Sequence, residues 1–590
     1  MYHENQDVYT SNDSPFEVRG DSLYMYVSSR HGSGVQKICN FVPCIVQEKT
    51  VDDGAAADTR LVLRARHSDG SLLPDVEIGA GELAGFNWLI PKWGAKCNIE
   101  CGQSQKDRLR YFIQSTAQFA VQCTEYRVTG WKRTPRGWRY LLPGCEGEDV
   151  ILKGKLDRYR TENTWDEEDL RTAMLLFTDP PGNAAIIRTL TAFTFLSPLN
   201  EFLRRAQCEP KFVLFLSGRT GTRKSTLAAL FLSFFGSFSA ADLPMSFRDT
   251  PNSIIANAFT LKDVLTCIDD YYPSENLEMR KLTACAQTVM RAYGDRAGRA
   301  RLRSDCSLME SRPPQGNAIV TGELHPAVGE SGTARYFALT LRDGDVDLGK
   351  LTAFQNAAQD GALRRAMHAY TEWIGEKYLQ TEDGERELVR RLGERYAYHR
   401  GGYLKQARSG HGRLAETVAS LMIGCEFFLC FLSDRGLISR DARYTAARDF
   451  YNSLLLCTAR QTEIIEREKP VNIFIRKLYA LIESGEIRLK RKGSEGDYSP
   501  DYFCGLEDDT YMMLQLEAVH RRIKRLCADQ DEPFPFNIQE ISKALVEADM
   551  ADPGNQKVSR VIKIQGRNYR LLFLYKEKAE EVVGLNEPKA

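Results

Sequence analysis

The segment that most constrains this chain is an apolar strand, a glycine-rich turn and the start of a helix, which follow one another between residues 212 and 226. Five apolar residues, Phe212 to Leu216, precede Gly218 and Gly221, and a helical pattern begins at Ser225. Glycines let backbone N–H groups curl around an anion, and the start of the following helix adds its positive end. This context is typical of a phosphate-binding loop (P-loop).

Seven residues of this loop are predicted to contact a nucleotide: Gly218, Gly221, Thr222, Arg223, Lys224, Ser225 and Thr226. Lys224 would reach the β and γ phosphate oxygens of ATP, and Ser225 would hold Mg²⁺. The strict pattern G-x-x-x-x-G-K-[ST] is not met, because Arg223 occupies the position of its second glycine. Two alternatives therefore stay open: a degenerate loop, since arginine adopts a glycine conformation poorly, and an ordinary turn with a solvated lysine.

Two carboxylates end a second apolar strand. Asp269 and Asp270 directly follow the run from Val264 to Ile268. In P-loop ATPases the first acid orders the Mg²⁺ shell and the second polarises the attacking water. We expect Asp269 to bind Mg²⁺ together with Ser225, and Asp270 to orient water, although its reach is one methylene shorter than that of the usual glutamate. The alternative is a strand-end turn with solvated acids.

Two later residues complete the expected catalytic set. Thr321 ends a third apolar strand, where a hydroxyl would sense the γ-phosphate. Arg335 precedes the next apolar run and is a candidate arginine finger, supplied by a neighbouring subunit. The alternatives are a strand cap for Thr321 and a surface ion pair for Arg335.

The sequence resembles the AAA+-type, helicase-like ATPases of phages, plasmids and mobile chromosomal cassettes, which carry a poorly characterised amino-terminal domain and a core related to MCM helicases. The run 312–323 is the most specific match, and the resemblance covers roughly residues 16–400. The matching segments are 126–131, 138–142, 216–236, 250–258, 264–273, 294–305, 312–323 and 331–347. The resemblance implies a ring-forming motor.

An arginine-rich segment lies between the second and third apolar strands. Seven basic residues and one acid fall between residues 279 and 303, in a chain that is neutral overall with 79 Lys+Arg and 79 Asp+Glu. We name residues 294–303 the arginine loop, and expect it to track the phosphates of single-stranded DNA. A solvated or subunit-facing loop is the alternative. The predicted DNA contacts are Arg296, Arg299, Arg301 and Arg303.

A length of 590 residues suggests three to five globular units. Short apolar runs alternate with helical segments in the middle of the chain, which favours a parallel sheet. We predict a multidomain α/β fold made of a polar tail (1–15), a mostly β (α+β) amino-terminal domain (16–150), a helical linker (151–206), a P-loop NTPase core of the AAA+/ASCE type with a parallel sheet (207–349), a helical region or lid (350–485) and a winged-helix-like domain (486–590).

These features together predict an ATP-dependent DNA helicase or translocase that assembles into a hexameric ring and serves replication of a mobile genetic element. ATP and Mg²⁺ are the expected cofactors, and single-stranded DNA and further copies of the chain are the expected partners. The alternatives are an ATP-gated loader, regulatory or defence assembly protein without unwinding, and a P-loop scaffold without hydrolysis. No apolar run long enough for a membrane span and no signal peptide is evident, so we expect a cytoplasmic protein without a membrane partner.

Overall fold

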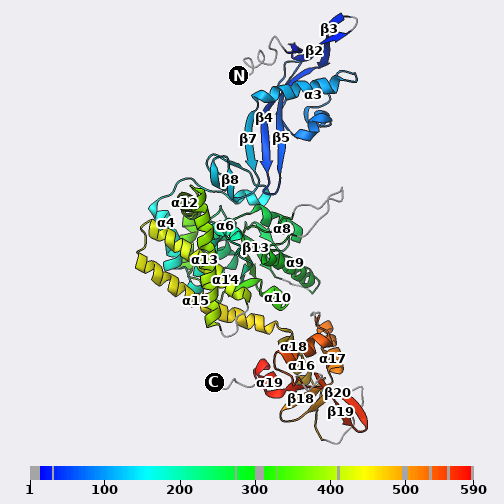
Figure 1. The fold of residues 1–590 in the computed structure, drawn as a ribbon, viewed down its shortest axis with the longest axis vertical. Coiled ribbons are helices and arrows are strands. Elements are labelled where there is room, and N and C mark those ends of the chain that lie inside the picture. The colour runs from blue at the N-terminus through cyan, green and yellow to red at the C-terminus, as the bar shows by residue number, and fades with distance from the viewer. Residues whose placement is uncertain are drawn as a thin grey trace.

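The computed structural model describes residues 14–29, 32–272, 276–298, 311–326, 328–407, 412–493, 503–530, 534–553 and 558–585. Figure 1 shows three bodies that follow one another along the long axis of the molecule. Each body has a large hydrophobic core of its own, formed mainly by residues 16–113, 131–457 and 471–579. The chain is therefore a multidomain α/β protein.

The first body contains two β-sheets and two helices. Side chains of the long strand Ala57–His67 alternate between buried and half-buried positions from Leu61 onward, as expected for a strand with one face on a core. The first sheet joins β1 (Phe16–Arg19), β2 (Ser22–Ser29) and β3 (Gly32–Cys39), the second has the order β10 (Asp149–Val150), β7 (Val121–Tyr126), β4 (Phe41–Asp52), β5 (Ala57–His67) and β6 (Val76–Gly79), and the helices are α2 (Leu89–Trp93) and α3 (Gln105–Ser115).

A hairpin between these strands packs on the central body. It consists of β8 (Gly130–Thr134) and β9 (Gly137–Leu141). Trp131 lies in the core of the central body, where its ring Nε1 donates a hydrogen bond to the carbonyl of Pro198 (2.8 Å). The backbone approaches so closely that a Cβ at Gly130 would lie 2.5 Å from the Lys262 carbonyl oxygen. The expected domain 16–150 is thus divided, because long-range packing assigns the hairpin to the next core.

The central body is built on a five-stranded, all-parallel sheet. Strands β11 and β14 are buried along their whole length, which explains their nearly continuous apolar sequences. The order is β12 (Met245–Ser246), β13 (Leu265–Tyr271), β14 (Asn317–Gly322), β11 (Val213–Ser217) and β15 (Tyr336–Thr340). The helices between these strands are α7 (Lys224–Leu232), α8 (Pro251–Thr260), α9 (Asn276–Asp295) and α10 (Gly329–Thr333).

Further helices share the core of this sheet. The expected linker forms α4 (Glu167–Thr178), α5 (Ala184–Leu196) and α6 (Asn200–Arg205), and the expected lid forms α11 (Leu348–Gln359), α12 (Ala362–Tyr378), α13 (Glu382–Gln406), α14 (Gly412–Asp434) and α15 (Arg440–Arg467). Buried residues of each of these eight helices belong to the same hydrophobic core as the sheet. The linker and the lid are therefore parts of the central body and not separate units.

Helix α14 is long and apolar enough to cross a membrane, judged by length and composition among the residues that the structure describes. Yet 83% of its most apolar stretch is buried inside the protein. It packs on α5, where the ring of Phe428 stacks on Phe195 with centroids 4.0 Å apart. A Cβ on Gly424 would lie 2.0 Å from the Ala192 carbonyl oxygen. The expectation that no apolar run is long enough for a membrane span is therefore wrong, and this helix is a central element of the protein core.

The third body begins at α16 (Pro470–Glu483), since Phe474, Ile475 and Leu478 on this helix are buried in the last core. The expected boundary at residue 485 was therefore too late by one helix. The other elements are a sheet of order β16 (Lys490–Arg491), β17 (Gly505–Glu507), β18 (Tyr511–Leu514), β20 (Arg567–Tyr575) and β19 (Ser559–Ile564), and the helices α17 (Leu516–Asp529), α18 (Ile538–Glu547) and α19 (Lys576–Val583).

Candidate functional site

The predicted phosphate loop joins the end of β11 to the start of α7. Gly221 has a φ of 91°, in the left-handed region where glycine is favoured. Arg223 also adopts a left-handed conformation, with φ 68° and ψ 25°, at the position just before the helix. The loop thus takes a glycine-type conformation at Arg223, at a cost in backbone strain that a glycine would not incur.

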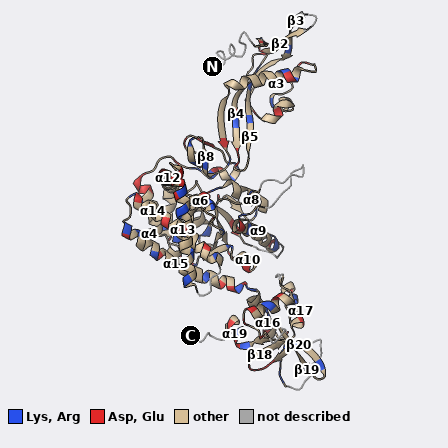
Figure 2. Ribbon diagram, viewed as in Figure 1, with Lys and Arg blue, Asp and Glu red and all other residues tan. Residues whose placement is uncertain are grey.

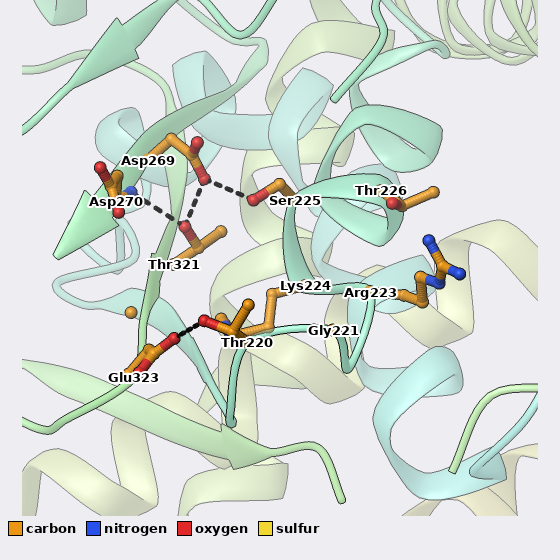
Figure 3. A pocket seen from close by; sticks show the side chains of 11 residues that line it. Thr220, Gly221, Arg223, Lys224, Ser225, Thr226, Asp269, Asp270, Thr321 and Glu323 are labelled. Carbon is orange, nitrogen blue, oxygen red and sulfur yellow. Dashed lines mark hydrogen bonds between the residues drawn. The ribbon is translucent and has the colours of Figure 1, made fainter. Parts of the chain in front are cut away.

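A cavity of about 290 Å³ opens beside this loop (Figure 3). It lies where the parallel strands β13 and β14 end next to α7. The structure brings together Lys224, Ser225, Asp269, Asp270 and Thr321, which the sequence placed in one site. The remaining lining residues are Thr220, Gly221, Arg223, Thr226, Gly322 and Glu323.

A hydrogen-bonded group of oxygens forms one wall of the cavity. Ser225 Oγ donates to Asp269 Oδ1 over 2.8 Å, and Thr321 Oγ1 donates to the same carboxylate oxygen. Hydroxyl and carboxylate oxygens are the hard ligands that Mg²⁺ prefers. The donor set of Ser225 and Asp269 therefore fits a magnesium ion bound together with a phosphate.

Asp270 lies at an irregularity of β13. The register between β13 and β14 shifts between Ile268 and Tyr271, and Asp270 has a φ of 66°. Its backbone N–H donates to Thr321 Oγ1 (3.1 Å), and its carboxylate forms an ion pair with Arg248 (3.3 Å). Consecutive residues of a regular strand point to opposite faces, and bulges change that direction. The irregularity accounts for two consecutive acids that both line the cavity.

The ammonium group of Lys224 lies within the curve of the loop. Its Nζ donates to the carbonyl oxygens of Gly218 (2.7 Å) and Arg219 (2.9 Å). Burial lowers the pKa of Lys224, and the neighbouring carboxylates of the cavity oppose this effect. Among the residues that the structure describes, Lys224 is the one lysine that lines the cavity, and carbonyl groups of the loop hold its ammonium group.

Arg335 lies outside this cavity, just before β15. Its guanidinium forms an ion pair with Asp295 (3.0 Å) and donates to the Ser331 carbonyl (2.6 Å). Arg413 from α14 binds the same Asp295 carboxylate (3.3 Å). Burial would raise the pKa of Asp295, but Arg335 and Arg413 outweigh it and hold that pKa below the usual value. Within its own chain Arg335 thus belongs to an ion-pair cluster at the end of α9.

Arg296 does not lie on a surface that DNA could contact. Its side chain is only 6% exposed, forms an ion pair with Glu209 (3.1 Å) and donates to the carbonyls of Pro210 and Gly316 (2.8 Å each). Burial lowers the pKa of this guanidinium. The expectation for Arg296 is wrong, since its donors are used by the interior of the protein. Arg299, Arg301 and Arg303 lie outside the described residues, and their expected contact with DNA stays a prediction.

Basic residues elsewhere are mixed with acidic ones. Figure 2 shows charges of both signs over all three bodies in the part of the chain that the structure describes. Glu323 also lines the cavity, and the sequence predicted no role for it. Its position two residues after Thr321, directly after the end of β14, was the available signal.

A parallel sheet with a glycine-type loop and a polar cavity at the ends of its strands is compatible with a P-loop-like core within a multidomain α/β protein. No protein-family model matches the sequence, and no curated protein matches it. A solved structure with a similar fold is Cch of SCCmec type IV, described as an active helicase. The TM-score is 0.58 with 14% sequence identity, and the match covers 97% of this chain and 99% of that chain. The structural similarity covers all three bodies, and it is a similarity of fold.

Proposed function

We propose that this chain is an ATP-driven DNA helicase or translocase of the AAA+ type, which acts as a hexameric ring in the cytoplasm and serves the replication of a mobile element. The observation that carries the proposal is the contact of Ser225 and Thr321 with one carboxylate oxygen of Asp269, beside Lys224. The fold similarity to a protein described as an active helicase favours this activity over other uses of a P-loop.

The strand order supports the proposed class. Strand β14, which carries Thr321, lies between the loop strand β11 and the acidic strand β13. An additional strand at this place is typical of the ASCE group of P-loop ATPases, to which AAA+ proteins belong. It puts a polar residue between the phosphate loop and the acids.

In this mechanism the loop from Gly218 to Thr226 surrounds the phosphates of ATP with backbone N–H groups. Lys224 neutralises charge on the β and γ oxygens. Ser225 and Asp269 would hold Mg²⁺, which would neutralise charge that develops on the phosphates. Each of these groups lines the same cavity or belongs to the same loop.

The remaining residues act on the reaction centre or between subunits. Thr321 contacts the γ-phosphate through its hydroxyl, and Asp270 helps to orient water. Arg335 is supplied to the nucleotide of the next subunit, after release from Asp295. The third body has helices α16, α17 and α18 and the hairpin β19–β20, which suits a winged helix that contacts a DNA backbone.

The substitution Lys224→Ala tests the site. We expect loss of ATP binding and of DNA-stimulated ATP hydrolysis, because a methyl group cannot stabilise charge on the phosphate oxygens. Lys211→Ala, at an exposed lysine just before β11, is the matched control and should keep both activities. Wild-type turnover in Lys224→Ala would refute the assignment of the loop.

Strand displacement separates the proposed helicase from its alternatives. A protein that hydrolyses ATP but neither separates a forked duplex nor moves along DNA would be an ATP-gated assembly protein. A protein that binds no ATP in calorimetry would be a scaffold with a degenerate loop.

A second pair of substitutions tests the division of roles between the acids. Asp269→Asn should raise the Mg²⁺ concentration needed for half-maximal turnover, since it removes a charged ligand. Asp270→Asn should spare nucleotide binding and slow hydrolysis. Equal effects of both substitutions on binding would contradict separate roles.

A further inference from the structure

The cavity holds a third carboxylate, that of Glu323, which has no role in the mechanism above. Glu323 lies two residues after Thr321 and directly follows the end of β14. Its Oε1 accepts a hydrogen bond from the hydroxyl of Thr220 in the phosphate loop (Figure 3). Its backbone N–H donates to the carbonyl of Tyr271 (3.3 Å), which ties this strand end to the end of β13. The carboxylate therefore touches the loop itself.

The other two carboxylates are occupied differently. Asp269 accepts from Ser225 and Thr321 and is part of the magnesium ligand set. Asp270 pairs with the exposed Arg248, and 45% of its side chain is exposed to solvent. Asp270 is thus held toward the open rim of the cavity, with a side chain one methylene shorter than that of a glutamate.

Glu323 and Lys224 line the same cavity. Lys224 is the group that would neutralise the γ-phosphate. Because Glu323 also contacts Thr220 of the phosphate loop, its carboxylate lies on the loop side of the cavity.

We propose that Glu323 orients the attacking water and accepts its proton, which makes it a catalytic residue of the ATPase. This inference rests on the proposed function. In the step, the water oxygen forms a bond to the γ-phosphorus while the bond from that phosphorus to the β–γ bridging oxygen breaks. The bond electrons leave with ADP, and the water proton passes to a Glu323 carboxylate oxygen, which later releases it to solvent. Asp270 then assists from the rim.

The test compares Glu323→Gln with Asp270→Asn in the full-length protein, through kcat, the KM for ATP and the Kd of a non-hydrolysable ATP analogue with Mg²⁺. The glutamine has nearly the same shape but cannot accept a proton. We expect kcat of Glu323→Gln to fall by about 10²- to 10⁴-fold, the range for loss of a general base, with nucleotide binding retained. Glu330→Gln, the same chemical change outside the cavity, is the matched control.

Two further variants separate catalysis from a structural role. Thr220→Val removes the hydrogen bond to the loop but leaves the carboxylate, and should turn over at least about ten times faster than Glu323→Gln. Glu323→Asp restores an acid and should regain part of the lost kcat. If Glu323→Gln keeps wild-type kcat, or loses binding and kcat in equal measure, the inference is overturned. Wild-type protein that hydrolyses no ATP would instead refute the proposed function.

Discussion

Replacement of Arg223 by glycine should stabilise the central body, although it removes a large side chain. Arg223 has φ 68° and ψ 25°, a left-handed conformation that costs a non-glycine residue about 1–2 kcal/mol. Glycine removes this cost but gives the unfolded chain more freedom, worth about 0.5–1 kcal/mol in the opposite direction. The net expected gain is about 0.5–1 kcal/mol.

The side chain of Arg223 contributes little that would offset this gain. It is exposed, and it makes no hydrogen bond or ion pair with any residue that the structure describes. Figure 3 shows it directed away from Asp269 and Thr321. The backbone conformation should therefore decide the sign of the change.

The measurement is thermal unfolding of the full-length protein without nucleotide. A gain of about 1 kcal/mol raises the transition of a large domain by about 2 °C. Arg223→Ala keeps a Cβ in the strained conformation and should change stability by less than about 0.5 kcal/mol. Gly221→Ala, at a φ of 91°, should destabilise by about 1 kcal/mol or more. If Arg223→Gly is no more stable than Arg223→Ala, the reasoning from strain is refuted.

Three other predictions concern assembly, pH and DNA. If the arginine finger acts in trans, a mixture of Lys224→Ala and Arg335→Ala subunits should regain ATP turnover that neither variant shows alone, and a mixture that stays inactive would contradict this. Burial alone would raise the pKa of Glu426, but hydrogen bonds from His399 and Arg395 outweigh it and lower the pKa to about 2. The lowered pKa corresponds to about 3 kcal/mol of folding stability, which is present above the usual carboxyl pKa and is lost as pH falls toward 2. In acid titrations, the free energies of unfolding of wild type and Glu426→Gln should therefore converge over that range. Alanine at the last three arginines of the arginine loop should flatten the salt dependence of single-strand binding by about 0.7 in slope per lost phosphate contact, whereas an unchanged slope with lost basal turnover would assign the loop to a subunit interface.

The strands that carry the site could be predicted from the sequence because they are buried on both faces. The runs before Gly218, Asp269 and Thr321 are nearly continuous apolar segments, and they coincide with β11, β13 and β14. The motif residues follow from their places at the ends of these strands. Local pattern was sufficient here, since each signal lies within a few residues.

Membership of a core could not be predicted in the same way. The hairpin around Trp131 and the helix α16 have local patterns that fit either neighbouring body, and only contacts with distant residues decide between them. Arg296 was misread for the same reason, because a charged residue beside a glycine resembles a surface loop until its buried partners are known. Glu323 was missed because its partner Thr220 lies more than a hundred residues earlier in the chain.

The division of the chain around the hairpin has a mechanical consequence. The chain leaves the first body after β7, forms β8 and β9 on the central body, returns as β10 to pair with β7, and enters the central core again at Leu152. A small cluster of Tyr126, Leu141 and Val150 fills the joint between these passages. A single linker would act as a swivel, whereas three passages resist torsion and leave bending as the softer movement. A torque applied to the central body would therefore be transmitted to the first body and not lost in rotation of a flexible tether.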